Sequence, residues 1–189
     1  NWNNGASAGV STTLSWNVEK VKNMSNIFLN NGAFNANISA WNPLSVEGLS
    51  SAFANASAFN NGFPPGSAGT ATISNTLDWN MPRLYSEDTR AARGLGLGST
   101  FYKATAFNSY INNWNVSSIH NITNIFYDAT SFNQPLDNWN VGNIQFMEYV
   151  FKDATSFNQP IGNWDVTSVG KFNSMFDGAS TFDQDISCW

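Results

Sequence analysis

Five asparagine residues stand in Asn-x-Ser/Thr sequences, whose side-chain nitrogen can accept an N-linked glycan in a secreted eukaryotic protein. They are Asn23, Asn37, Asn55, Asn115 and Asn121. Their positions in the repeat described below predict that Asn23, Asn55 and Asn121 face solvent and that Asn37 is intermediate in exposure. Asn115 is expected to be engaged in a ladder of side-chain hydrogen bonds. The candidate glycan acceptors are therefore Asn23, Asn37, Asn55 and Asn121, although a chain this rich in Asn and Ser contains several such sequences by composition alone.

Carboxylates at equivalent repeat positions are the second group with potential chemistry. Asp128 and Asp153 are one repeat apart, and Asp183 and Asp185 lie near the last residue. Paired carboxylates can bind calcium or act as a general acid and base. No EF-hand or glycine-rich calcium sequence accompanies them, and nothing in the sequence marks a cleft. Solvated surface acids are the favoured interpretation, so we expect no metal, no cofactor and no enzymatic activity.

The remaining composition excludes several further classes of function. His120 is the single histidine and Cys188 the single cysteine, which is too few for a usual Cys/His zinc site. Eight Lys and Arg against thirteen Asp and Glu leave a net charge of −5, which provides no basic footprint for nucleic acid. No apolar run approaches the roughly 18 residues of a membrane span. Cys188 is left as a possible cross-link to another chain.

An internal repeat positions all of these residues. Seven of the eight Trp residues recur at spacings of 25, 38, 35, 25, 25 and 25: Trp16, Trp41, Trp79, Trp114, Trp139, Trp164 and Trp189. Two series of Phe residues recur with the same repeat, one from Phe28 to Phe176 and the other from Phe34 to Phe182. The two long spacings indicate insertions at about 60–78 and 80–100 in a single domain spanning 1–189.

Each repeat contains a segment with helical spacing and a segment with extended character. From Val141 to Ala154, apolar residues recur every three or four positions, which is typical of one face of a short helix. The segment 157–164 contains Pro160 and predicts a short strand. One such unit cannot bury its own aromatic rings, so neighbouring units must stack. We therefore expect an α/β repeat solenoid, a right-handed stack of about six to seven coils with one short parallel strand and one short helix per coil.

Two series of polar residues are expected to form hydrogen-bonded ladders between coils. One follows each repeat Trp and the other follows each second Phe, for example Asn140 and Asn158. An amide can accept from one backbone N–H and donate to a carbonyl of the next coil. A column of hydroxyls, Thr105, Thr130, Thr155 and Ser180, suggests an ice-binding surface as a minor alternative.

The segments 114–119, 124–136 and 164–169, with sequences such as Trp-Asn-Val-Ser-Ser-Ile, are similar to a known repeat. They resemble the repeats of BspA-like leucine-rich-repeat surface proteins, first noted in mycoplasma proteins (DUF285-like). The resemblance implies a leucine-rich-repeat-like solenoid, a secreted or cell-surface location, and adhesion or matrix contact rather than catalysis. It provides no catalytic residues.

Two surfaces are candidates for contact with partners. Tyr102 and Tyr127 occupy equivalent positions, and Phe146 and Tyr149 lie three apart on the predicted outer helix face. The ends carry Trp2, Trp16, Cys188 and Trp189 without polar caps, so either the sequence continues beyond these residues or copies associate head to tail.

Together these features predict a non-enzymatic extracellular structural or adhesive repeat protein whose subunits stack head to tail into a surface filament or coat. The expected partners are another copy of the chain, or a cell-surface or matrix protein or glycan. The two insertions are expected to serve as contact elements. The alternative is a monomeric adhesin or carbohydrate-binding module that uses the aromatic face.

Overall fold

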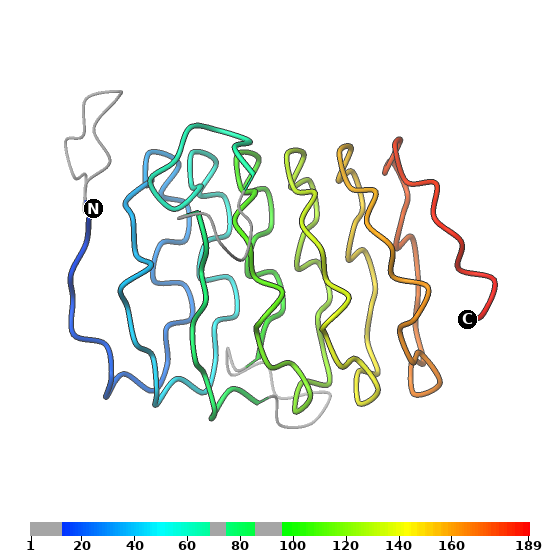
Figure 1. The fold of residues 1–189 in the computed structure, drawn as a ribbon, viewed down its shortest axis with the longest axis horizontal. Helices are drawn as coiled ribbons and strands as arrows, with labels where there is room; N and C mark the ends of the chain where they lie inside the picture. Colours follow the sequence, from blue (N-terminus) through cyan, green and yellow to red (C-terminus); the bar gives the residue numbers. More distant parts are fainter. Residues whose placement is uncertain (1–12, 69–74, 86–95) are drawn as a thin grey trace.

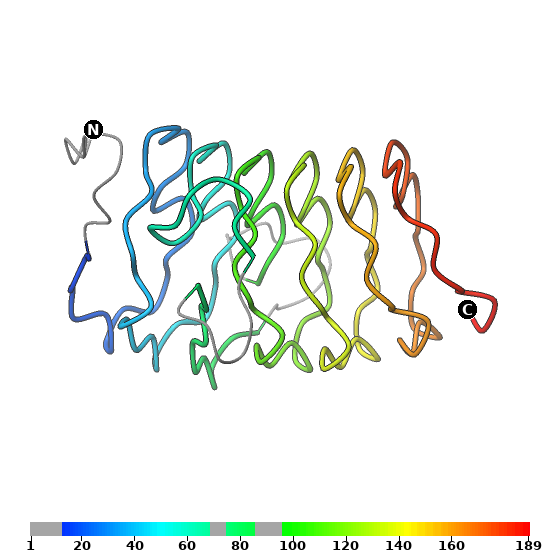
Figure 2. The same cartoon turned by 45° about the horizontal axis from the view of Figure 1, so that its top comes forward.

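The computed structural model describes residues 13–68, 75–85 and 96–189. The chain winds repeatedly about one long axis, and successive windings lie side by side from residue 13 at one end to residue 189 at the other (Figures 1 and 2). The contacts that matter are therefore those between one winding and the next.

The predicted α/β leucine-rich-repeat solenoid is wrong. The described residues contain no helix, and their only β pairing consists of isolated parallel bridges. These bridges are Thr13 to Asn37, Asn23 to Gly48, Gly48 to Gly96, Thr76 to Tyr110, Asn121 to Phe146, and Phe146 to Lys171. The windings are built from turns, and neither a helix nor a strand stands in each repeat.

Consecutive turns replace the predicted helix. The Ile27 N–H donates to the Met24 carbonyl at 3.2 Å, and the Asn31 N–H donates to the Phe28 carbonyl at 3.0 Å. In both turns the third residue is left-handed, Asn26 with φ 61° and Asn30 with φ 60°. A positive φ at this position is what a type II turn requires, and Asn tolerates it. Such turns place apolar side chains inward every three or four residues, as a helix would, which is why the spacing was misleading.

The turns recur at the equivalent positions of later windings. The left-handed residues there are Ser51, Asn55, Ser99, Lys103, Asn124, Asp128, Tyr149, Asp153, Ser174 and Gly178. Most are Asn, Asp, Ser or Gly, the residues that adopt this conformation at low cost. Lys103 and Tyr149 are the long side chains among them.

Backbone N–H groups that do not bond within a turn donate to carbonyls of the next winding. The Phe126 N–H donates to the Val150 carbonyl at 3.1 Å, and the Asp128 N–H donates to the Lys152 carbonyl at 2.7 Å. The Phe151 N–H donates in the same way to the Met175 carbonyl, at 2.9 Å. Because a helix would direct each N–H four residues back, these bonds to the next winding exclude a helix here.

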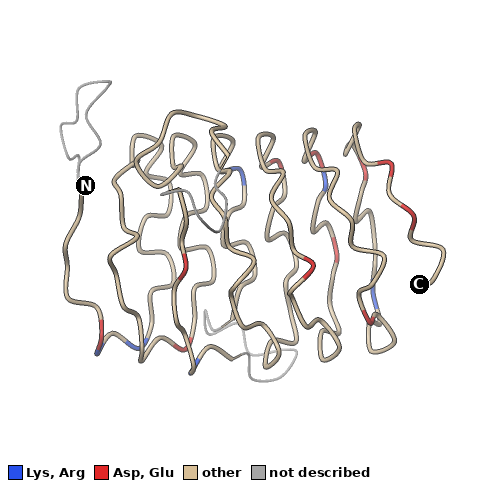
Figure 3. Ribbon diagram, viewed as in Figure 1, with Lys and Arg blue, Asp and Glu red and all other residues tan. Residues whose placement is uncertain are grey.

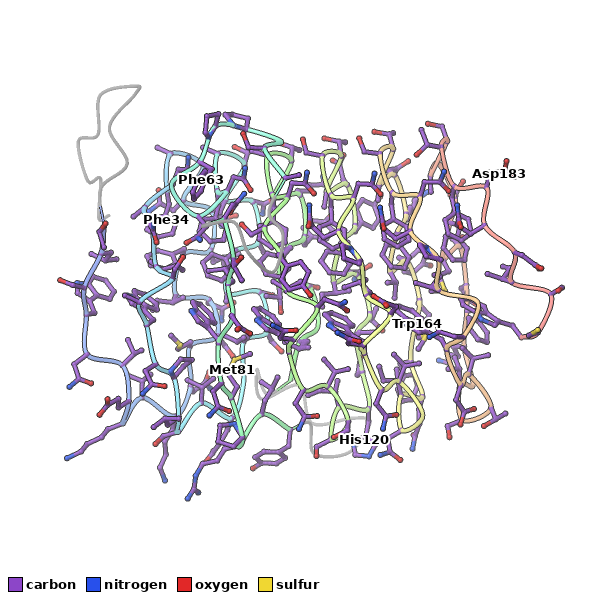
Figure 4. All side chains as sticks on the ribbon, in the orientation of Figure 1. Phe34, Phe63, Met81, His120, Trp164 and Asp183 are labelled. Atoms are coloured by element: carbon purple, nitrogen blue, oxygen red, sulfur yellow. The ribbon has the colours of Figure 1, made fainter. Side chains whose placement is uncertain are left out.

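Aromatic rings fill the interior in continuous columns (Figure 4). Centroids along one Phe column, Phe101, Phe126, Phe151 and Phe176, are 5.8, 5.7 and 5.7 Å apart. Centroids along the second, Phe107, Phe132, Phe157 and Phe182, are 5.7, 6.0 and 5.9 Å apart. The prediction that rings one repeat apart lie on one another is confirmed.

The tryptophans add a polar ladder to the apolar core. Trp114 is 2% exposed, and its indole Nε1 donates to the Leu77 carbonyl of the preceding winding at 2.5 Å. The equivalent indoles also donate to a carbonyl of the preceding winding: Trp41, Trp79, Trp139 and Trp164. Each repeat Trp here therefore fills the core and satisfies a backbone carbonyl.

The stack continues across both predicted insertions. The rings of Phe53 and Phe101 lie 5.6 Å apart, and those of Trp79 and Trp114 lie 5.9 Å apart. Within the first insertion, the Gly66 N–H donates to the Ala106 carbonyl at 3.0 Å, which holds this segment against a later winding. Residues 69–74 and 86–95, the middle of each insertion, lie outside the described residues.

One of the two predicted amide ladders is confirmed. Each winding donates a backbone N–H to the amide oxygen of the preceding one: Asn60 to Asn35, Asn108 to Asn60, Asn133 to Asn108, Asn158 to Asn133, and Asp183 to Asn158, at 2.8–3.0 Å.

The ladder predicted after each Trp is wrong for Asn17, Asn115, Asn140 and Asp165. There the side chain accepts from the backbone two residues later, as Asn140 does from the Gly142 N–H at 3.2 Å. Such an Asx turn is local and leaves the side chain at the surface.

Candidate interaction surface

The consecutive turns form one side of every winding, which we call the turn face: residues 23–30, 48–55, 96–103, 121–128, 146–153 and 171–178. Its character changes along the stack. The first two segments contain no charged residue, whereas the last four carry three lysines and four acids. Figure 3 shows that charged residues are sparse along the described part of the ribbon. The candidate interaction surface is the charged and aromatic part of the turn face, which consists of its last four segments, 96–103, 121–128, 146–153 and 171–178.

Tyr102 and Tyr127 lie together on this surface, as their equivalent positions predict. Their ring centroids are 4.9 Å apart at an interplanar angle of 36°. Lys152, in the next winding, lies over the Tyr127 ring with its ammonium 6.0 Å from the centroid. That ammonium also hydrogen-bonds the carboxylate of Asp177 one winding further on, which raises the pKa of Lys152. Two rings, a cation and a carboxylate thus follow one another along the stack.

Phe146 and Tyr149 are on the same face, but not on a helix. Phe146 takes part in two parallel bridges, and the Lys171 ammonium lies 5.7 Å from its ring centroid. Tyr149 is 36% exposed and left-handed, with φ 59°. Glu148 between them accepts a hydrogen bond from Thr123 Oγ1 at 3.0 Å and lies 3.7 Å from the Lys171 ammonium.

The carboxylate pair proposed from the sequence lies at the edge of this surface. Asp128 and Asp153 occupy equivalent left-handed positions. Burial raises the pKa of Asp128 above its ordinary value of 3.8; Lys103 opposes the rise and Asp153 adds to it. In residues 13–68, 75–85 and 96–189, no three His, Cys, Asp or Glu side chains are placed to hold a metal ion.

The glycan-acceptor candidates differ in exposure. Asn23 is exposed, whereas Asn37, Asn55 and Asn121 are half-buried. Asn55 also donates its side-chain nitrogen to Asn30 Oδ1 at 2.7 Å. Asn115, which was expected to be engaged in a ladder, is exposed and accepts only local bonds, from the Ser117 N–H at 3.1 Å and hydroxyl at 2.7 Å.

The hydroxyl column is used within the stack. Thr130 donates its hydroxyl to the Thr105 carbonyl at 3.3 Å, and Thr155 donates to the Thr130 carbonyl at 3.4 Å. These hydroxyl protons are therefore directed at the preceding winding and away from solvent, which gives the column a structural role.

The end residues also have defined positions. Trp16 is 37% exposed, with its ring 5.6 Å from that of Trp41. Trp189 is half-buried and stacks on Trp164 at 6.2 Å, but its indole Nε1 is buried without a hydrogen-bond partner. Cys188 is an exposed free thiol. Trp2 lies outside the described residues.

Sequence reasoning identified the aromatic residues of this surface and missed its lysines. Lys103, Lys152 and Lys171 each lie over a ring: Tyr102 at 5.4 Å, Tyr127 at 6.0 Å and Phe146 at 5.7 Å. The repeat phase contained the signal, because Lys152 and Lys171 stand one repeat after Tyr127 and Phe146.

The aromatic columns, the amide ladder and the turns recur with the repeat, and comparison with known families agrees with this periodicity. The sequence profile of DUF285, a family described as Mycoplasma protein of unknown function, matches residues 4–78 and 95–189. The chain belongs to this family. The finer assignment to BspA-like leucine-rich-repeat proteins is not confirmed by this match. No curated protein and no solved structure matches the chain.

The expectation of no membrane span was tested on the described part of the chain. There, no helix has the length and apolar character needed to cross a bilayer.

Proposed function

We propose that this DUF285 protein is a non-enzymatic structural and adhesive repeat protein of the cell exterior, secreted or surface-attached, and that its copies stack head to tail into a filament or coat. The resemblance of its repeats to those of BspA-like surface proteins supports the location and the adhesive role. The observation that carries the assembly proposal is the uniform pairing between windings.

This pairing makes a winding complementary to another winding. The Met147, Tyr149 and Phe151 N–H groups donate to carbonyls of the segment 171–175, and the same pairing recurs between the earlier windings. A winding of one copy has the groups needed to pair in this way with a winding of another copy. We propose that it does so, which is a heterologous contact that extends without closing.

Electron microscopy and sedimentation velocity of the purified chain test this proposal. The wild type should form fibres whose mass increases with concentration. Replacing Trp189 by Asp should shorten them, because a carboxylate in a ring-stacking interface must be desolvated. Asn140→Asp is the matched control: it adds the same charge at an exposed Asx turn, where the next repeat already has Asp165. Monodisperse wild-type protein, or fibres of equal length from both variants, would contradict head-to-tail stacking.

A second candidate function is a monomeric carbohydrate-binding module or adhesin. It is favoured by the gathering of Tyr102, Tyr127, Phe146 and Tyr149 on one face of the stack. The two functions are compatible, because these aromatic residues lie in the segments 96–103, 121–128 and 146–153, before the last winding of the stack.

A further inference from the structure

Tyr149 is the residue of the turn face that the fold explains least. Its backbone is left-handed, with φ 59°, in a position that is Asn26, Ser51, Ser99, Asn124 and Ser174 in the other windings. A bulky L-residue is strained there, whereas Asn is tolerated. The strained position therefore holds an aromatic side chain that the turn does not require. Strain of this kind points to function.

The Tyr149 ring is also available to a ligand. The residue is 36% exposed, unlike the Phe residues of the interior. Within the described ranges, no other ring and no lysine ammonium lies against it, in contrast to Tyr102, Tyr127 and Phe146. It is thus an exposed aromatic platform on a backbone fixed by the Tyr149 N–H bond to the Asn173 carbonyl at 3.0 Å.

Residues with hydrogen-bonding side chains stand at neighbouring positions of the stack. Asn124 and Ser174 occupy the equivalent positions of the two adjacent windings, and Glu148 and Asp153 belong to the same turn segment. An aromatic ring with amide, hydroxyl and carboxylate residues at neighbouring positions suits a sugar, whose C–H face packs on the ring and whose hydroxyls both donate and accept.

The charges of the face favour an uncharged sugar. Lys152 pairs with Asp177 and lies 3.8 Å from Asp153, and Lys171 lies 3.7 Å from Glu148. Two of the three lysines of the face are thus paired with carboxylates, and the chain as a whole carries −5. A sulfated or sialylated glycan would be repelled by this field, whereas a neutral one is indifferent to it.

We propose that Tyr149 is the platform of a binding subsite for neutral glycans on the turn face. This inference rests on the adhesive part of the proposed function and is independent of head-to-tail stacking.

The test is a glycan array of neutral, sialylated and sulfated oligosaccharides, followed by titration of the best neutral glycan. Wild-type protein should bind neutral glycans. Tyr149→Asn, which restores the residue found at positions 26 and 124, should weaken binding at least about tenfold. The same variant should melt about 2–4 °C higher because the backbone strain is relieved. If Tyr149 served only for packing, its replacement would not weaken glycan binding while raising the melting temperature.

Leu29→Asn is the control, because it changes an exposed apolar side chain in a turn-face segment without charges and should leave binding unchanged. Tyr149→Ser provides a second variant with the residue found at positions 51, 99 and 174. No binding to any neutral glycan, preference for sialylated or sulfated glycans, or equal binding by the Tyr149 variants would overturn the proposal. Fibre formation by Tyr149→Asn, followed by microscopy, reports separately on the assembly.

Discussion

At the scale of single residues, the left-handed positions decide what each turn can tolerate. Asn30, Asn55, Lys103, Asp128, Asp153 and Gly178 occupy one such position in successive windings. Gly178 has a further reason to be glycine, because a Cβ there would overlap the Asp153 carboxylate. Lys103 and Tyr149 stand where local preference would place Asn. Most side chains at these positions fit the turn, whereas these two do not.

Asp128 allows the electrostatics of this column to be tested. Burial raises the pKa of its carboxyl above 3.8 in the folded state, so the ionised form is less favourable there than in the unfolded chain. This cost is present at neutral pH, decreases as the pH falls through the raised pKa, and is absent below 3.8. Asp128→Asn should therefore be more stable than wild type at pH 7 and lose that advantage near pH 3. Urea unfolding at both pH values measures the difference.

Asp78→Asn is the control for Asp128→Asn, since it removes the same charge from an exposed side chain. Two results would contradict burial of the carboxyl as the cause. Asp128→Asn could be no more stable than wild type at pH 7, or its advantage over wild type could be as large at pH 3 as at pH 7.

At the scale of the element, the winding replaces the helix and the strand. Both a helix and a run of turns bring apolar side chains to one side every three or four residues, so the spacing from Val141 to Ala154 could not distinguish them. The distinguishing signal was polar: Asn124 and Asp128, four residues apart, are residues that favour left-handed turns. The amide ladder was predictable after Phe because Asn133 and Asn158 stand one repeat apart at equivalent positions. The ladder predicted after Trp does not form at Asn140, because its side-chain oxygen accepts from the Gly142 N–H two residues later in the same winding.

The ladder should contribute measurably to stability. Asn133 Oδ1 accepts from the Asn158 N–H at 3.0 Å and from Gln159 Nε2 at 2.8 Å. Asn133→Ala leaves the Asn158 N–H without its acceptor, whereas Gln159 Nε2 keeps its bond to the Asn133 carbonyl at 3.2 Å, so the free energy of unfolding should fall by about 1–3 kcal/mol. Asn133→Asp keeps the acceptor, and Asp183 holds the same position two windings later, so this variant should cost much less. Urea titration compares the two, and equal losses would show that the acceptor is unimportant.

At the scale of the whole molecule, the stack is a scaffold of nearly identical windings with one differentiated side. The sequence predicted the register of the Phe and Trp columns, because large rings at fixed spacing can be buried only against one another. It also identified the aromatic residues of the turn face, but it did not predict that lysines lie over three of their rings, since spacing alone does not give the direction of a side chain. If both proposed roles are right, Trp189→Asp should impair assembly alone and Tyr149→Asn should impair glycan binding alone.

The central claim is that windings pair with one another through the segments that resemble helices. Scalar couplings across hydrogen bonds, measured by NMR on isotope-labelled protein, identify the acceptor of each N–H directly. The stack predicts coupling from the Phe151 N–H to the Met175 carbonyl and from the Phe126 N–H to the Val150 carbonyl. Coupling from the Phe151 N–H to the Met147 carbonyl, four residues earlier, would contradict it and restore the helix.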